Sequence, residues 1–271
     1  MIKIRQFLRM LPPGRRTEVL EELNQASSPG FDYFLLVILS CSIATFGLIT
    51  DSAAVIIGAM LVAPLMSPIL GLSLASVAGE QRMFRRAMVA LIEGVLLAAG
   101  LSAFLAWLTH ALPFDILIEL PGEVLARTHP SPFDLGIALA GGAAAAYALA
   151  QPRLSAALPG VAIATALMPP VCTLGIGIAL GNIQIAFGAA LLFFTNLAAI
   201  SLAGIIVFAA LGFRPKNIKD TWNHIPRSLF ISAALVLVTA IPLVILTLRL
   251  VNQAHFTQEV RQAAIAEISS L

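Results

Sequence analysis

The sequence predicts an all-α integral membrane protein with about seven transmembrane helices, built as two inverted three-helix repeats plus one extra helix. The composition predicts the class, because 59% of the 271 residues are hydrophobic and only 11% are charged, whereas a soluble domain carries about 25% charged residues. A Gly/Pro-broken motif that recurs at a fixed offset predicts the two repeats. A one-sided distribution of lysine and arginine predicts how the helices are oriented.

Seven apolar segments are long enough to cross the membrane as helices, which takes about 20 mostly apolar residues. The predicted spans are 31–49, 53–78, 87–112, 134–150, 156–180, 184–211 and 229–250. The chain therefore divides, in order, into a cytoplasmic amphipathic N-terminal segment (1–30), a first repeat (31–112), an external loop (113–133), a second repeat (134–211), a cytoplasmic loop (212–228), a seventh transmembrane helix (229–250) and an external amphipathic C-terminal segment (251–271).

Local composition justifies the less regular elements. Residues 1–11 place apolar side chains near one helical face beside three basic residues, which is typical of a helix lying on an anionic membrane surface. After a Pro-Pro-Gly break, 15–25 can form a second short helix. The loop 113–133 holds four prolines and, with Asp134, four acidic residues. The span 134–150 is dominated by Ala and Gly, and small residues let helix backbones approach closely, so we expect this helix inside the bundle.

The positive charges orient the spans. Thirteen of the 16 lysines and arginines fall before the first span or in the loops that follow the second, fourth and sixth spans. Cytoplasmic loops carry such an excess, so we expect the N-terminus in the cytoplasm and the C-terminus outside. Because each repeat holds three spans, an odd number, the second repeat is upside down relative to the first, which makes an inverted-topology repeat.

The repeated motif lies in the second and fifth spans. The run Ile57–Pro68 reads IGAMLVAPLMSP and the run Pro159–Pro170 reads PGVAIATALMPP. At an offset of 102 residues, the glycine, the Leu-Met pair and the last proline of the first run coincide with those of the second. Proline lacks an N–H and clashes with the carbonyl four residues back. Both spans are therefore expected to break and to open carbonyls in the membrane interior.

Those carbonyls and the nearby hydroxyls form the predicted binding site for a small solute or ion. Its members in the two motifs are Gly58, Pro64, Ser67, Pro68, Thr165, Pro169 and Pro170. Paired, interrupted segments in two halves of a membrane protein favour a transport site. The alternative interpretation is a pair of kinks that only shape the bundle, with Ser67 bonded back to its own helix.

Two polar residues in the third spans extend this predicted site. Glu93 is the only carboxylate deep inside a predicted span, and intramembrane acids usually face the bundle interior or water. At the same offset, Glu93 coincides with Thr195 and its neighbour coincides with Asn196, so both repeats place polar groups at one level. We expect Glu93 to face the bundle interior near the breaks. The alternatives are an ion pair of Glu93 with Arg86 or Arg153, and an ordinary helix–helix hydrogen bond for Asn196.

The runs Ile57–Ile69, Gly160–Pro170 and Gly188–Ile200 resemble the uncharacterised hydrophobic membrane protein family catalogued as domain of unknown function 389. The resemblance covers most of 31–250 and is most specific in the run GAMLVAPLMSP. It implies a multi-pass protein of the prokaryotic cytoplasmic (inner) membrane, and it implies no settled activity.

The sequence therefore favours a transporter or channel that conducts a small solute or ion across the lipid bilayer. The alternative is a non-transporting membrane scaffold or sensor that assembles, for instance as a homo-oligomer, through small-residue helix faces. A formal net charge of +2 argues against nucleic-acid binding. The sequence offers no nucleophile–base pair and no metal-ligand spacing, so we expect no enzyme activity, no cofactor and no metal. Cys41 and Cys172, each in an apolar run, are expected to be inert packing residues.

Overall fold

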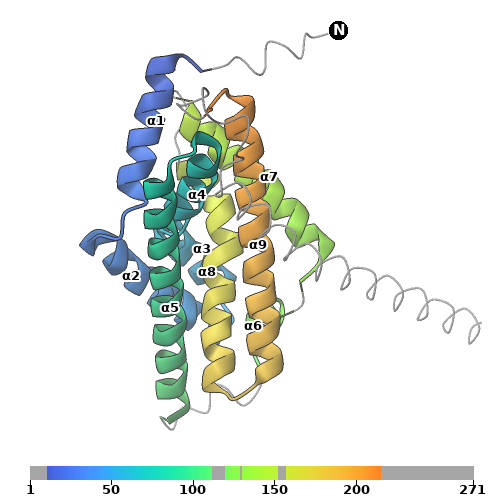
Figure 1. Ribbon diagram of the computed structural model, residues 1–271. Helices are drawn as coiled ribbons and strands as arrows, with labels where there is room; N and C mark the ends of the chain where they lie inside the picture. The colour runs from blue at the N-terminus through green and yellow to red at the C-terminus, as the bar shows by residue number, and fades with distance from the viewer. Residues whose placement is uncertain (1–10, 112–119, 129, 152–156, 215–271) are drawn as a thin grey trace, which may run out of the picture.

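The computed structural model describes residues 11–111, 120–128, 130–151 and 157–214, and for 157–166 it describes only the course of the backbone. Within these ranges every regular element is a helix, as predicted. The helices are α1 (Pro13–Ala26), α2 (Phe31–Ile49), α3 (Ala53–Val62), α4 (Met66–Ala78), α5 (Gln81–Ala111), α6 (Gly122–Leu125), α7 (Pro132–Ala150), α8 (Ala157–Ala179) and α9 (Ile183–Ala210) (Figure 1). Residues 1–10 of the predicted interfacial helix, the predicted seventh helix and the C-terminal segment lie outside the described residues.

Four stretches of the described chain are helical, long and apolar enough to cross a membrane: α2, residues Gln81–Thr109 of α5, residues Phe133–Ala150 of α7, and α9. Helices α3 and α4 pass the same test together, as one span bent by 51°, which brings the number to five by length and composition. The described part of the chain therefore has the character of a membrane-embedded protein. The expected total of seven spans and the inverted repeat remain predictions.

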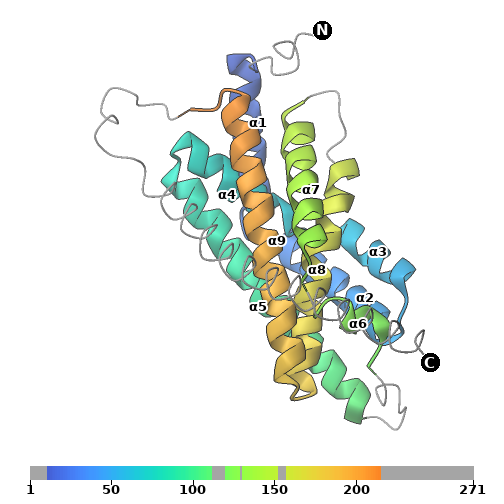
Figure 2. The same ribbon diagram turned by 90° about the vertical axis from the view of Figure 1, so that its right-hand side faces the viewer.

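Helix α8 lies at the centre of the bundle, between α5 and α9, and α9 packs in turn on α7 (Figures 1 and 2). Glycines permit the closest of these approaches. A Cβ atom on Gly142 of α7 would lie 2.8 Å from the Cα atom of Ile200 in α9, which is too close for any real side chain. The face of α7 around Gly142 is therefore buried against α9, but the helix is largely exposed, with Phe133 and Ile137 on its surface, so the expectation that it lies inside the bundle is not met among the described residues.

The first motif breaks where the sequence predicts. Residues 63–65 separate α3 from α4, and Pro64 stands in the middle of this break. Pro68 does not interrupt a helix, because it lies in the first turn of α4. The N–H groups of a first helical turn have no partner within the helix, so a proline there removes no hydrogen bond.

Helix α1 holds the broken segment in position. The hydroxyl of Ser27, the C-cap residue of α1, donates a hydrogen bond to the carbonyl oxygen of Ser67 at 2.9 Å. Ser27 fits against α4 because Gly71 has no side chain there, and a Cβ atom on Gly71 would meet the Ser27 hydroxyl. The first turn of α4 is thus bonded to an element outside the apolar bundle.

Two arginines of α1 bond the carbonyls at the ends of other helices. Arg15 donates to the carbonyl oxygens of Leu149 and Ala150, at 3.1 and 3.3 Å, at the end of α7. Arg16 donates to the carbonyl oxygen of Gly212, at 2.7 Å, just after α9. Helix ends leave such carbonyls without partners. Burial lowers the pKa of Arg15, but hydrogen bonds with two glutamates of α1 more than offset this, so the net pKa is raised.

The second motif does not break, and the prediction of non-helical backbone at that point is wrong. Helix α8 runs without interruption through Pro169 and Pro170. The two prolines are adjacent, so the lost N–H groups and the crowded carbonyls fall within a single turn. Both prolines are buried, and α8 is supported by α5, α9, α7, α2 and α3. Interior prolines are tolerated in transmembrane helices when neighbouring helices support the backbone in this way.

Candidate functional site

A polar pocket of about 290 Å³ lies where α6 and the residues after it meet α7, α8 and α9; Figure 2 shows α6 beside this end of the bundle. Two residues of the predicted site, Pro170 and Asn196, line its inner part. The other lining residues are the charged Glu123, Arg127 and Asp134 and the apolar Ala126, Ile137 and Leu192. The structure thus brings part of the predicted site together with charges from the loop region.

Helix α6 and the turn that follows it supply the first two charges, Glu123 and Arg127. Asp51, which follows α2 with a φ of 54°, accepts a hydrogen bond from the backbone N–H of Glu123 at 2.7 Å. This N–H belongs to the first turn of α6, where a helix cannot pair it internally. Arg127 donates to both the carbonyl oxygen and the carboxylate of Glu123. Their side chains are 18% and 25% exposed, so the ion pair is largely shielded from solvent.

Asp134 supplies the third charge from the start of α7. Its Oδ2 atom accepts hydrogen bonds from the backbone N–H and the hydroxyl of Ser131, at 2.8 and 2.6 Å. Its own N–H donates to the Ser131 hydroxyl at 3.3 Å, which completes a capping box. The capping box holds the carboxylate in one orientation. With Glu123 and Arg127, the lining carries one net negative charge at neutral pH.

The inner end of the pocket lies among packed helices. Asn196 is only 3% exposed, and Pro170 is buried. Buried polar groups are nearly always hydrogen-bonded, and they bond to water where no protein group is within reach. The hydroxyls of Thr173 on α8 and Thr195 on α9 are also buried and have no hydrogen-bond partner among the described residues, but neither residue lines the pocket. The polar side chain that lines this end of the pocket is therefore that of Asn196.

The remaining predicted residues of the first motif do not line the pocket. Gly58 is exposed on α3, and a Cβ atom there would meet nothing within 4 Å. Pro64 and Ser67 are half-buried and Pro68 is buried, at the break and against α1. Their observed role is to shape the first motif.

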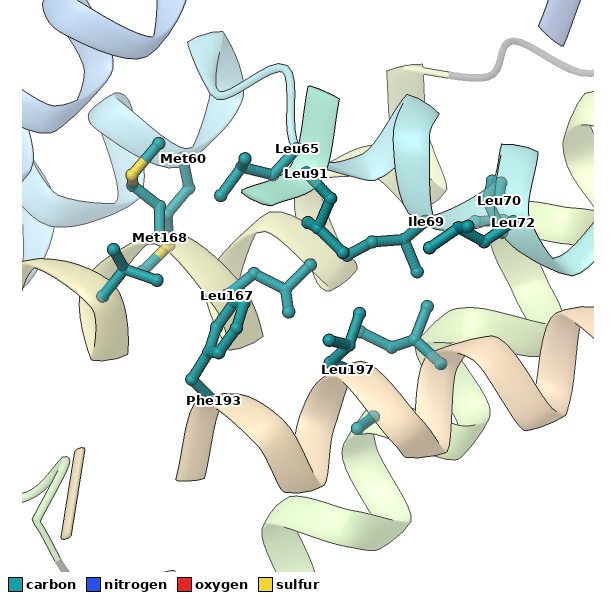
Figure 3. Close-up of a cluster of buried hydrophobic side chains, with 14 of the residues drawn as sticks. Met60, Leu65, Ile69, Leu70, Leu72, Leu91, Leu167, Met168, Phe193 and Leu197 are labelled. Carbon is teal, nitrogen blue, oxygen red and sulfur yellow. The ribbon is translucent and has the colours of Figure 1, made fainter. Parts of the chain in front are cut away.

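An apolar cluster fills the space between the two motifs (Figure 3). Leu65 and Leu167, which coincide at the offset of 102 residues, both point into this cluster, and Leu197 of α9 joins them. Met60 of α3 and Met168 of α8 also belong to this cluster. The two motifs therefore approach one another through apolar side chains rather than through opened carbonyls.

Glu93 does not join either region. Its side chain is exposed on α5, so the expectation that it faces the bundle interior is wrong for the part of the chain that the structure describes. It also forms no ion pair with Arg86. Thr165 lies in the part of α8 for which only the backbone is described.

A second set of polar contacts crosses the bundle between α2, α5 and α8. The Sγ atoms of Cys41 and Cys172 lie 3.7 Å apart, and both cysteines are free and buried. The hydroxyl of Thr45 donates to that of Ser102 at 3.0 Å, and Ser102 donates to the carbonyl oxygen of Cys172 at 2.7 Å. The two thiols are therefore neighbours in one hydrogen-bonded region, although they are 131 residues apart in the sequence.

Sequence reasoning missed the charged wall of the pocket. In the sequence, Glu123 and Asp134 were identified only as acidic residues of the predicted external loop and not as members of a site. Arg127 carried the one usable signal, because it is one of only three basic residues on the predicted external side. A basic residue on the side that lacks positive charge has a local reason to be there, which here is the ion pair with Glu123.

The region that holds both motifs and the pocket is shared with other proteins. Residues 60–202 match the family described as "Domain of unknown function (DUF389)". An uncharacterized protein of Methanocaldococcus jannaschii is 30% identical over 200 residues, which are 74% of this chain, and the matched stretch spans 60% of that relative's length. No solved structure matches the chain.

Proposed function

This chain belongs to the family described as "Domain of unknown function (DUF389)", and from that premise we propose that it is a transporter or channel for a small solute or ion. The observation that carries the proposal is the polar pocket. Its rim is charged, and its inner end reaches Pro170 and Asn196 inside helices that are otherwise apolar. Polar groups within membrane helices are costly and commonly mark substrate or ion pathways.

The chemistry of the lining suits a small polar or charged guest. Asn196 offers both a donor and an acceptor through its amide. Pro170 has no N–H, so the carbonyl four residues before it receives no helical hydrogen bond from this position. These groups can replace part of the hydration shell of a guest that leaves water.

The proposed path is closed in the described conformation. The apolar cluster that contains Leu65, Leu167 and Leu197 separates the pocket from the first motif. Apolar constrictions gate channels because water does not fill them. Passage would therefore require α8 to move relative to the break between α3 and α4. The break itself is a suitable hinge, since residues 63–65 belong to neither α3 nor α4.

Blocking the pocket tests the proposal directly. Ala126 is exposed at the rim, so Ala126→Trp should plug the mouth without disturbing the packed helices, and Asn196→Leu should remove the amide at the inner end. In proteoliposomes we expect passage of at least one of potassium, chloride, acetate or glycine above the protein-free rate. Both variants should reduce that passage about tenfold or more, Ala126→Trp because it obstructs the mouth and Asn196→Leu because an apolar group cannot replace the lost polar contacts.

The matched control is Gln184→Leu, which removes an amide side chain from the exposed start of α9, outside the pocket. It should leave passage unchanged. If none of the four solutes crosses faster than in protein-free liposomes, or if Ala126→Trp and Asn196→Leu behave like Gln184→Leu, the pocket is no pathway. A scaffold or sensor would then be the better interpretation, with assembly through the outer face of α7 that exposes Phe133 and Ile137.

The proposal includes an inner-membrane location with the N-terminus in the cytoplasm. Helix α5 has 31 residues, or about 46 Å of length, which exceeds the roughly 30 Å of bilayer hydrocarbon. In a background with Cys41 and Cys172 replaced by serine, we introduce one cysteine at Gln81 and another at Ala111, both exposed at opposite ends of α5. An impermeant maleimide should label intact cells at position 111 only. Labelling at position 81 alone would reverse the orientation, and labelling at both would show that α5 does not cross.

A further inference from the structure

An apolar groove of about 340 Å³ opens on the outer side of the bundle between α5 and α9. Its lining differs from that of the polar pocket, which carries charged side chains. Among the described residues, only apolar side chains line the groove, chiefly Met88, Ile92 and Leu96 of α5 and Phe193, Phe194 and Leu197 of α9. Ile92, Leu96 and Phe194 are 50%, 67% and 48% exposed. The groove is therefore a surface feature and not a gap in the core.

Basic residues stand directly above this groove on α5. Arg85 precedes Ile92 by seven residues and Leu96 by eleven, which places all three on one helical face at 100° per residue. Arg82 and Arg86 flank Arg85, and all three arginines are exposed. No acidic side chain among the described residues forms an ion pair with any of them. Within the described residues, the groove thus has three guanidinium groups without an acidic partner at one end and apolar side chains along its length.

The dimensions fit one leaflet of a bilayer. Met88 and Leu96 lie three and eleven residues beyond Arg85, or about 4.5 and 16 Å along the helix axis. Half of the hydrocarbon thickness is about 15 Å. A guest that places an anionic group beside Arg85 can therefore lay an acyl chain along the groove down to the level of Leu96. Guanidinium groups bind phosphate through paired hydrogen bonds as well as by charge.

We propose that this groove binds an anionic phospholipid, with its phosphate at Arg85 and an acyl chain against Ile92, Leu96 and Phe194. The charge distribution favours this occupant over the predicted seventh helix of the same chain. Residues 229–250 contain no acidic side chain, so that helix would cover the apolar groove and leave the arginines unneutralised. The proposal is independent of whether the protein conducts a solute.

Native mass spectrometry can measure how much lipid stays bound to the protein. The full chain is incubated with phosphatidylglycerol or phosphatidylethanolamine and then released from detergent in the spectrometer. We expect the wild type to retain phosphatidylglycerol preferentially. Arg85→Ala should lower that retention about fivefold, the effect of one basic residue at a lipid surface. Arg86→Ala removes the same charge about 100° around the helix and is the matched control, with a smaller expected loss. Ile92→Trp should fill the groove and lower the retention of both lipids.

Two outcomes would overturn the proposal. Equal losses for Arg85→Ala and Arg86→Ala would mean that lipid is attracted by diffuse charge and not by a site. If residues 229–250 occupied the groove, Ile92→Trp would lower the melting temperature and leave lipid retention unchanged. Arg85 is exposed, so its replacement does not disturb folding, and a melting curve of each variant in detergent verifies this.

Discussion

Replacing Gly175 by alanine should push α8 away from α5 and lower the free energy of unfolding by about 3 kcal/mol. A Cβ atom on Gly175 would lie 2.5 Å from the carbonyl oxygen of Ala99, 2.7 Å from Cβ of Ser102 and 2.8 Å from the backbone nitrogen of Ala103. Two of these three atoms belong to the backbone of α5 and cannot rotate away. Because α8 is the central helix, the displacement would also disturb its contacts with α9.

The matched controls are Gly100→Ala in α5 and Gly58→Ala in α3. A Cβ atom at either position would meet nothing within 4 Å, and alanine favours a helix over glycine by about 1 kcal/mol. Thermal and denaturant unfolding in detergent micelles should therefore show Gly175→Ala melting earlier than the wild type, and both controls melting at the same temperature or later. Similar melting for all three variants would show that α5 and α8 are not in close contact. A loss of stability on Gly58→Ala would give that glycine a packing role which the structure does not show.

Joining Cys41 to Cys172 should stop solute passage almost completely, provided that passage needs α8 to move. Their Sγ atoms are 3.7 Å apart, and a disulfide bond of about 2.05 Å requires only a modest approach. Iodine or copper–phenanthroline would accept the two electrons, and the two thiols would release two protons. The bond would tie α2 of the first predicted repeat to α8 of the second. We expect at least a tenfold loss of passage, restored by dithiothreitol.

Cys172→Ser is the control, because it keeps the size and polarity of the side chain and cannot be cross-linked. Its passage should be insensitive to the oxidant. Peptide mass spectrometry under non-reducing conditions measures the fraction of cross-linked protein, so chemistry and transport are read separately. If the disulfide forms in most molecules and passage continues, then α2 and α8 do not move apart during passage. The hinge proposed for residues 63–65 would then be unnecessary.

The sequence predicted local features of this fold better than it predicted their consequences. Composition identified the membrane class, and Pro64 correctly predicted the break of the first motif. The same reasoning was wrong for Pro169 and Pro170, because the helix is held there by the helices around it. Proline weakens a helix by a fixed local amount, but packing decides whether the helix breaks. Such packing cannot be read from the motif itself.

The candidate site shows the same division. Pro170 and Asn196 were predicted as site residues because, within an apolar span, the first removes a helical hydrogen bond and the second is polar. Both line the pocket. Glu93 was predicted to face inward and is exposed: its place along the helix follows from the sequence, but the direction of its side chain around the helix depends on the neighbours. The charges of Glu123 and Arg127 reach the pocket through a contact between a loop and distant helices, which no local pattern specifies.

The bonds made by α1 also have a consequence for biosynthesis. Arg16 donates to the carbonyl of Gly212, 196 residues later, and Arg15 donates to carbonyls about 135 residues later. Among the described helices α1 precedes all the others in the chain, yet its partner Gly212 follows α9. Contacts between residues so far apart in sequence form late, because a long chain must first be brought together. A ribosome stalled before residue 212 would therefore display α1 without its bond to Gly212, although its partners Ser67, Leu149 and Ala150 have already been synthesised.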